Sequence, residues 1–274
     1  MLEIFLTSLT FILNTFFGLV VFYRNRKSWT NRLFFILALL INAYLVANYW
    51  SLHPTLPYAE NQLLWIRIVM FITSFIGPVL LLLVHTFPRQ SITMKVQARI
   101  ALAILCIVSA GASLSPFVFT SLEYPMGKPV PTPGPAIPLF FIDFVGLFFL
   151  SFIQLIRKYQ RRQGLEKIQI SYFLTGIIAT FSLMAFTTVI FVVVLKNSDF
   201  VFLGPVSSLV LIGFVAYATI RHRLFDLRLA LTSGEGEIEL RTVIAAERVA
   251  EVEELLEEDG IEAPGLDVAL SNLT

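Results

Sequence analysis

Residues 62–86 have the sequence QLLWIRIVMFITSFIGPVLLLLVHT, in which Arg67 is the one charged side chain. A helix needs about 20 mostly apolar residues to cross the roughly 30 Å hydrocarbon core of a bilayer. This stretch therefore predicts a membrane-spanning helix that is long enough to tilt or bend. Six other windows have the same character. The seven predicted spans are residues 4–23, 32–50, 62–86, 100–120, 137–156, 170–195 and 200–220.

The composition of the whole chain agrees with this prediction. Hydrophobic residues make up 57% of the 274 residues and charged residues 14%, whereas a soluble domain is about 25% charged. The formal net charge is only +1, which excludes nucleic-acid binding as the main function. Cys106 is the single cysteine, which excludes a disulfide-stapled secreted domain. We therefore predict an all-α membrane protein, built as a seven-transmembrane helical bundle in the lipid bilayer.

Basic residues in the loops predict the orientation of the bundle. Four of the segments that flank the spans hold 15 Lys and Arg residues, and the loops between them hold 2. Because basic residues concentrate on the cytoplasmic side, we expect the N-terminus outside, the C-terminus in the cytoplasm and a location in the inner (plasma) membrane. The 15 residues are Arg24, Arg26, Lys27, Arg32, Arg89, Lys95, Arg99, Arg157, Lys158, Arg161, Arg162, Lys167, Arg221, Arg223 and Arg228.

Charge also divides the chain into two regions. Residues 1–231 carry a net charge of +11 and residues 232–274 a net charge of −10. We expect the first region to be a transmembrane domain and the second a short acidic cytoplasmic tail. Within the tail, a linker precedes residues 241–258, whose apolar residues fall on one helical stripe opposite Glu residues. This spacing predicts one amphipathic helix.

Polar residues inside the predicted spans mark a candidate sensing site. Arg67 in the third span and Asp143 in the fifth lie at similar distances from the outer ends of their spans, which places both roughly 8–10 Å deep at 1.5 Å per residue. At matched depth they could form an ion pair, or each could extend toward the surface. Alternatively, they line a ligand pocket open to the outside, with Trp65 and Asn48 at similar depth. We therefore treat Trp65, Arg67, Asp143 and Asn48 as candidate sensing residues.

Two other patterns predict helix contacts and bends. Asn14 and Asn42 fall near the midpoints of the first and second spans, where an amide hydrogen bond between helices would contribute roughly 0.6–2 kcal/mol. Pro78, Pro116 and Pro205 interrupt the third, fourth and seventh spans. Each proline removes a backbone donor and bends its helix, so we predict kinks at all three.

The sequence contains no constellation typical of a catalytic, metal or cofactor site. His53, His85 and His222 are scattered, with no Cys or carboxylate at ligand spacing. No glycine-rich phosphate loop occurs. Cys106 lies in an apolar run, which is typical of a small core residue. We expect neither a metal nor a cofactor.

Three segments of the membrane part carry a resemblance to a known family. They are Leu64–Arg67 with Gly77-Pro78 and His85–Pro88; Glu166–Gln169 with Tyr172 and Gly176; and Gly204-Pro205 with Tyr217–Arg228. The last string is the most specific, an apolar helix that ends in Arg221-His222-Arg223-Leu224-Phe225-Asp226-Leu227-Arg228. On these residues the chain, over about residues 1–231, resembles the N-terminal seven-transmembrane sensor region of bacterial histidine kinases.

This resemblance implies a signal-sensing module of a two-component receptor. A stimulus acting on the outer half of the bundle or within the bilayer would pass through the seventh helix to Arg221–Arg228, the candidate output. The resemblance also implies a homodimer and a cytoplasmic kinase or response partner, on the same chain or a separate one. No His follows His222 and 51 residues follow Arg223. We therefore expect neither a phospho-accepting His nor an ATP-binding domain in this chain, and no enzyme activity.

A small multi-span transporter or channel is the alternative that the sequence leaves open. Transporters are commonly built from internal repeats, and ionisable residues inside the membrane mark their ion and substrate pathways. This chain shows no internal repeat and few ionisable residues within its spans, which favours the sensor.

Overall fold

The computed structural model describes residues 2–53, 61–87, 94–123, 130–187 and 202–222. The chain divides into two units, Met1–Phe225 and Asp226–Thr274. The second unit lies outside the described residues. The predicted tail helix at 241–258 and most of the candidate output, residues 223–228, therefore lie outside them too.

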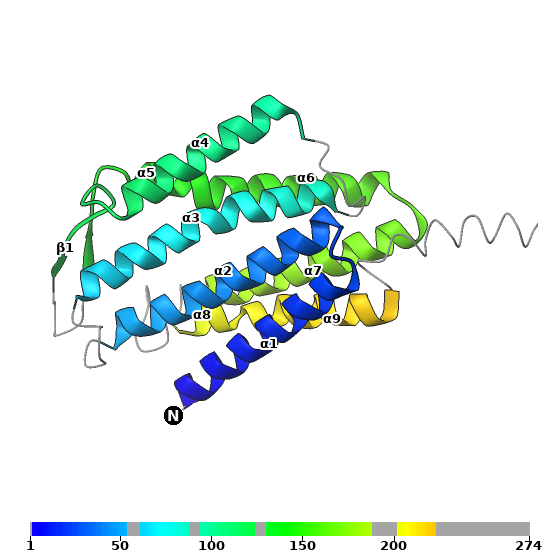
Figure 1. Ribbon diagram of the computed structural model, residues 1–274, viewed down its shortest axis with the longest axis horizontal. Helices are drawn as coiled ribbons and strands as arrows, with labels where there is room; N and C mark the ends of the chain where they lie inside the picture. The colour runs from blue at the N-terminus through cyan, green and yellow to red at the C-terminus, as the bar shows by residue number, and fades with distance from the viewer. Residues whose placement is uncertain (1, 54–60, 88–93, 124–129, 188–201, 223–274) are drawn as a thin grey trace, which may run out of the picture. The chain divides into compact units, whose positions relative to one another are not determined.

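Helices dominate the first unit (Figure 1). The long helices are α1 (Leu2–Arg24), α2 (Trp29–Leu52), α3 (Gln62–Thr86), α4 (Val96–Ser113), α6 (Leu147–Arg161), α7 (Gly164–Thr187) and α9 (Ser208–His222). The shorter elements are α5 (Ile137–Phe141), the π-helix η2 (Ile142–Gly146), α8 (Leu203–Val206) and the strands β1 (Phe119–Glu123) and β2 (Val130–Pro133). The elements α5, η2 and α6 follow one another without a gap and together form the fifth predicted span.

Six helical segments are long and apolar enough to cross a membrane. They are Leu2–Arg24, Trp29–Leu52, Gln62–Thr86, Val96–Ser113, Ile137–Arg161 and Glu166–Met184. They correspond to the first six predicted spans and confirm the prediction of an all-α, multi-pass membrane protein. The seventh predicted span, 200–220, corresponds to α8 and α9, which a turn at Ser207 separates. Seven spans remain a prediction, because neither piece is long enough within the described residues.

The helices of the first unit pack in a closed series. α1 contacts α2, α2 contacts α3, α3 contacts α6, α6 contacts α7, α7 contacts α9, and α9 contacts α1 again. α4 packs against α3 and leaves Ile100, Ile104 and Ile107 exposed. A helix with apolar residues on its exposed face is typical of a membrane span, because that face can contact lipid.

A continuous apolar core fills one end of this series. Its most buried members lie at the end of α1, the start of α2, the end of α3, the inner part of α6, the start of α7 and the middle of α9. They include Val21, Leu33, Phe34, Leu83, Val84, Phe87, Leu155, Ile170, Phe173 and Val215. The pattern of basic residues predicts that this end faces the cytoplasm.

The predicted contact between Asn14 and Asn42 is confirmed. Asn14 Nδ2 donates to Asn42 Oδ1 at 3.1 Å, and both side chains are buried between α1 and α2. Asn42 Nδ2 in turn donates to Thr15 Oγ1 at 2.8 Å. A Cβ at Gly18 would lie 3.0 Å from the Ala38 Cβ, so the glycine allows α1 to approach α2 closely and the amides to meet.

The fourth predicted span ends earlier than expected. α4 ends at Ser113 and the chain turns toward β1, so Pro116 lies outside the helix and the kink predicted there is wrong. The cause is local, because a proline disfavours the helical backbone conformation in the residue before it. Ser115 N–H instead donates to the Ala112 carbonyl in a turn. β1 then pairs antiparallel with β2.

Candidate functional site

A cavity of about 270 Å³ lies inside the helix series, next to the apolar core. Each contributing helix presents one face to it, with residues three or four positions apart, which is the spacing of one side of a helix. The lining residues are Leu37, Ile41 and Tyr44 of α2; Val69, Met70, Thr73, Ile76, Gly77 and Leu80 of α3; Phe140, Phe144 and Phe148 of α5, η2 and α6; Ile177, Thr180, Phe181 and Met184 of α7; and Gly204, Ser208 and Leu211 of α8 and α9. The described part of α1 and α4 contributes none.

The cavity is stacked on the core along the helix axes. Leu37, Leu80, Phe148, Ile177 and Leu211 belong to both, one residue from each of five helices. On every one of these helices the other core residues continue toward the predicted cytoplasmic end, and the other cavity residues continue the opposite way. The cavity therefore occupies the half of the bundle that is predicted to face outward.

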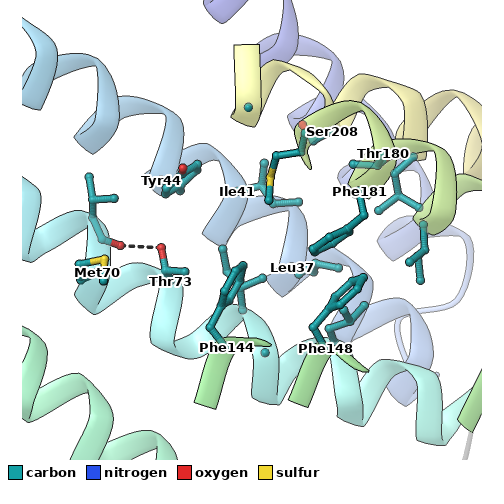
Figure 2. A pocket seen from close by; sticks show the side chains of 18 of the residues that line it. Leu37, Ile41, Tyr44, Met70, Thr73, Phe144, Phe148, Thr180, Phe181 and Ser208 are labelled. Atoms are coloured by element: carbon teal, nitrogen blue, oxygen red, sulfur yellow. Dashed lines mark hydrogen bonds between the residues drawn. The ribbon is translucent and has the colours of Figure 1, made fainter. Parts of the chain in front are cut away.

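Aromatic rings form one wall of the cavity. Phe140, Phe144 and Phe148 are four residues apart, and the Phe148 ring stacks on Phe181 of α7 (Figure 2). In an α-helix, each step of four residues overshoots a full turn by about 40°, so the third ring would rotate away from the first. The π-helix η2 has a wider turn, which takes up this drift and keeps all three rings on the cavity wall.

Hydroxyl groups supply the polar part of the lining. They belong to Tyr44, Thr73, Thr180 and Ser208 (Figure 2). Thr73 Oγ1 donates to the Val69 carbonyl at 2.7 Å. Thr180 Oγ1 and Ser208 Oγ are buried and have no hydrogen-bond partner among the residues that the structure describes. The described lining contains no charged side chain.

The predicted ion pair between Arg67 and Asp143 is not formed. Arg67 instead donates from Nε and Nη2 to the Phe119 carbonyl of β1, at 3.3 and 2.7 Å. Asp143 lies level with Gly77, since a Cβ on Gly77 would be 2.6 Å from the Asp143 carbonyl oxygen. Gly77 is about 15 Å from Arg67 along α3 at 1.5 Å per residue. The two side chains therefore lie at different depths.

Asp143 itself is fully buried in the π-helix. Cys106 and Ser109 of α4 are among its polar neighbours. Neither carboxyl oxygen has a hydrogen bond of good geometry within the described ranges. Asp143 faces away from the central cavity, since it is not part of the lining although Phe140 and Phe144 on either side of it are.

Trp65 and Asn48 also lie outside the central cavity. The Trp65 ring meets the Trp50 ring edge-on at 4.4 Å and lines a second cavity of about 470 Å³ between α1, α2 and α3. Asn48 is buried, and its carbonyl accepts a hydrogen bond from Ser51 Oγ. The four residues predicted for sensing are thus not brought together in one site. Of the predicted output, Arg221 and His222 form the end of α9.

Lys158 is a residue whose role the sequence analysis missed. Its Nζ donates to the carbonyls of Val84 at 2.7 Å and His85 at 2.9 Å, and to the carbonyl of Phe87. The ammonium group thereby satisfies carbonyls that the end of α3 leaves without partners inside the helix. His85 Nδ1 also lies 3.3 Å from Gln154 Oε1 of α6. The segment His85–Pro88, which is part of the resemblance to the sensor family, therefore begins at the point where α6 holds the end of α3.

Comparison with known proteins identifies a family. A family model described as the N-terminal 7TM region of histidine kinase matches residues 6–228. No curated protein and no solved structure matches the chain. Within the described residues, no group of His, Cys, Asp and Glu side chains could hold a metal ion.

Proposed function

Because the chain belongs to the family of N-terminal 7TM regions of histidine kinase, we propose that it senses a ligand in its central cavity and passes the signal through its seventh helix to Arg221–Arg228. Membership of the family makes the chain a membrane signalling module of the two-component type. The proposal concerns where the signal binds and which helix carries it inward.

The observation that carries the proposal is the shared wall of the cavity. Gly204, Ser208 and Leu211, from α8 and α9, line it together with residues of α2, α3, α6 and α7. An occupant of the cavity would therefore contact the same helix that ends in Arg221 and His222. A ligand shifts a conformational equilibrium only through different contacts in the two states, and this wall provides contacts on the output helix itself.

The break between α8 and α9 supports a movable seventh span. α8 contains Pro205 and ends at Val206, and α9 begins at Ser208. At the turn, Ser207 N–H keeps the helical bond to the Leu203 carbonyl but shares it with the Gly204 carbonyl, and Val210 N–H donates to the Ser207 carbonyl, three residues back instead of four. Prolines and interrupted hydrogen bonding are common causes of bends in helices. A bend next to the cavity allows α9 to change its tilt without moving α8 equally.

The remaining elements of the proposal follow from the family and the charge pattern. The module acts as a homodimer in the inner membrane, with its N-terminus outside, and signals to a cytoplasmic kinase or response partner. Trp65, Arg67, Asp143 and Asn48 affect sensing indirectly, through the positions of the helices around the cavity. Arg67, for example, holds β1 against α3.

The test measures whether filling the cavity moves α9. Arg24→Cys and His222→Cys are spin-labelled in the full chain, in a Cys106→Ser background, and reconstituted in lipid nanodiscs. The distance between the labels is measured by double electron–electron resonance. Ser208→Phe adds a ring from α9 into the cavity, and Thr180→Phe adds one from α7. Gly213→Phe is the matched control, because a Cβ at Gly213 meets no atom within 4 Å.

We expect both cavity-filling variants to shift the distance between residues 24 and 222, and the control to leave it unchanged. The use of two variants from different helices guards against misfolding of either one. An unchanged distance in both folded variants would refute the proposal that the cavity controls α9. An equal shift in Gly213→Phe would refute it as well, because the effect would then not depend on the cavity.

A further inference from the structure

We infer that the central cavity binds a compact, uncharged, mostly apolar molecule of about eleven non-hydrogen atoms, with a hydrogen-bonding oxygen directed at Thr180 and Ser208. This inference rests on the proposed function, since it assigns a ligand class to the same cavity. Four properties of the lining support it: volume, charge, shape and unsatisfied polar atoms.

The volume sets the size of the ligand. A dry protein cavity of about 150 Å³ holds one benzene molecule, which has six non-hydrogen atoms. The central cavity measures about 270 Å³, which scales to about eleven such atoms. A peptide, a nucleotide or a full lipid tail is larger than this space.

The absence of charge in the described lining sets the polarity. An ionised ligand would lose its hydration in the cavity and find no opposite charge among the lining residues. Burying an unpaired charge is far more costly than burying a neutral polar group. Amino acids, organic acids and ammonium compounds are therefore disfavoured. Rings on one wall favour a flat or branched apolar body, which can stack on Phe144 and Phe148 (Figure 2).

The two hydroxyls without partners set the position of the polar group. Serine and threonine in helices commonly donate to a carbonyl one turn earlier, and Thr10, Thr73, Ser113 and Ser151 do so in this chain. Thr180 and Ser208 are at least nine-tenths buried and have no such bond to any described residue. Each hydroxyl can donate and accept, so each can bond to a ligand hydroxyl or carbonyl.

This placement connects recognition to output. Thr180 lies on α7 and Ser208 on α9, two helices that pack directly against each other. A ligand oxygen bonded to both would join α7 to α9 at the level of the cavity. A purely apolar ligand of the same shape fills the space without making this link.

The experiment compares two probes of equal shape. 2-Naphthol has the estimated size and one hydroxyl, and 2-methylnaphthalene replaces that hydroxyl with a methyl group. Tritiated 2-naphthol is bound to the full chain in nanodiscs in a scintillation proximity assay, with empty nanodiscs to measure partition into lipid. Unlabelled 2-naphthol, 2-methylnaphthalene and the anion 2-naphthoate are the competitors.

We expect saturable binding, with 2-naphthol about tenfold tighter than 2-methylnaphthalene, as one or two net hydrogen bonds provide. Thr180→Val and Ser208→Ala should each reduce this preference and leave 2-methylnaphthalene within about twofold of its original affinity. Thr10→Val is the matched control, because Thr10 lies on α1 outside the cavity lining and its hydroxyl bonds to the Leu6 carbonyl, and it should keep the preference. Ser208→Phe should abolish binding of both probes by filling the cavity.

Several results would overturn the inference. They are no saturable binding, equal affinity for the two naphthalenes, tighter binding of 2-naphthoate, or a loss of preference in Thr10→Val as large as in Thr180→Val. Binding that survives in Ser208→Phe would place the ligand elsewhere. The spin-label distance separates the two proposals. If the probe binds as expected and the distance between residues 24 and 222 does not change, the ligand class holds and the proposed function fails. If the distance shifts in the cavity-filling variants and the probe does not bind as expected, the proposed function stands and the ligand class is refuted.

Discussion

Replacing Lys158 by Met tests whether α6 holds the C-terminal end of α3. Methionine keeps an unbranched apolar stem of similar length and removes the ammonium group that donates to the carbonyls of Val84, His85 and Phe87. Hydrogen bonds with a charged partner contribute about 1.5–3 kcal/mol each. The three bonds share one charge on a half-buried side chain, so they are not additive, and we expect a total loss of about 2 kcal/mol.

Hydrogen–deuterium exchange measured by mass spectrometry localises this loss. A local cost of about 2 kcal/mol corresponds to roughly thirtyfold faster exchange, and we expect it where α3 ends, in residues 81–87. Lys167→Met is the matched control, since Lys167 lies over the Tyr159 ring at 5.0 Å and belongs to the same predicted cytoplasmic end. Unchanged exchange at 81–87 in Lys158→Met, or equal acceleration in Lys167→Met, would refute the reasoning.

Three further predictions concern helix contacts. A double-mutant cycle of Asn14→Ala and Asn42→Ala should give a coupling energy of about 0.6–2 kcal/mol in unfolding titrations, and a coupling near zero would contradict the buried amide bond. Gly77→Ala should lower the free energy of unfolding by about 1–3 kcal/mol, because the added Cβ would meet the Asp143 carbonyl. Gly111→Ala is the control, since a Cβ there meets nothing within 4 Å and should cause no such loss. Equal thermal stability of the two variants would argue against a tight approach of α3 to Asp143. Arg67→Met should speed exchange of the β1 amides about tenfold, and Arg67→Lys should give a smaller effect; exchange unaffected by either change would remove the proposed link between α3 and β1.

The sequence was sufficient to predict the membrane class and most of the helices. The third predicted span has the same bounds as α3, because hydropathy and length alone decide whether a segment can cross a bilayer. The contact between Asn14 and Asn42 was also predictable. Two adjacent antiparallel spans joined by a short loop must pack together, so residues at their midpoints meet.

Contacts between distant spans were not predictable in the same way. The depth of Asp143 was estimated from the start of its span, but the π-helix and the segment before it place Asp143 level with Gly77. Lys158 contributes to the charge bias of the loops, and nothing in the sequence shows that it reaches the end of α3. The cavity depends on which five helix faces meet. In the sequence alone, nothing distinguishes Thr180 and Ser208 from other hydroxyl residues in the spans, because only the packing of the helices brings them to the cavity.

The central cavity and the apolar core follow one another along α9, and this arrangement allows the helix to rotate about a point in the core. Val215 lies in the core at the midpoint of α9, seven residues from Ser208 and seven from His222, so each arm is about 10 Å long. The core side chains around Val215 resist sideways displacement of this point of the helix, because close-packed side chains have little free volume. A sideways push on Ser208 from the cavity would therefore turn the helix about Val215. His222 would move by a similar amount in the opposite direction, so a displacement at the cavity would reach the C-terminal end of α9 without any sliding of the helix along its axis.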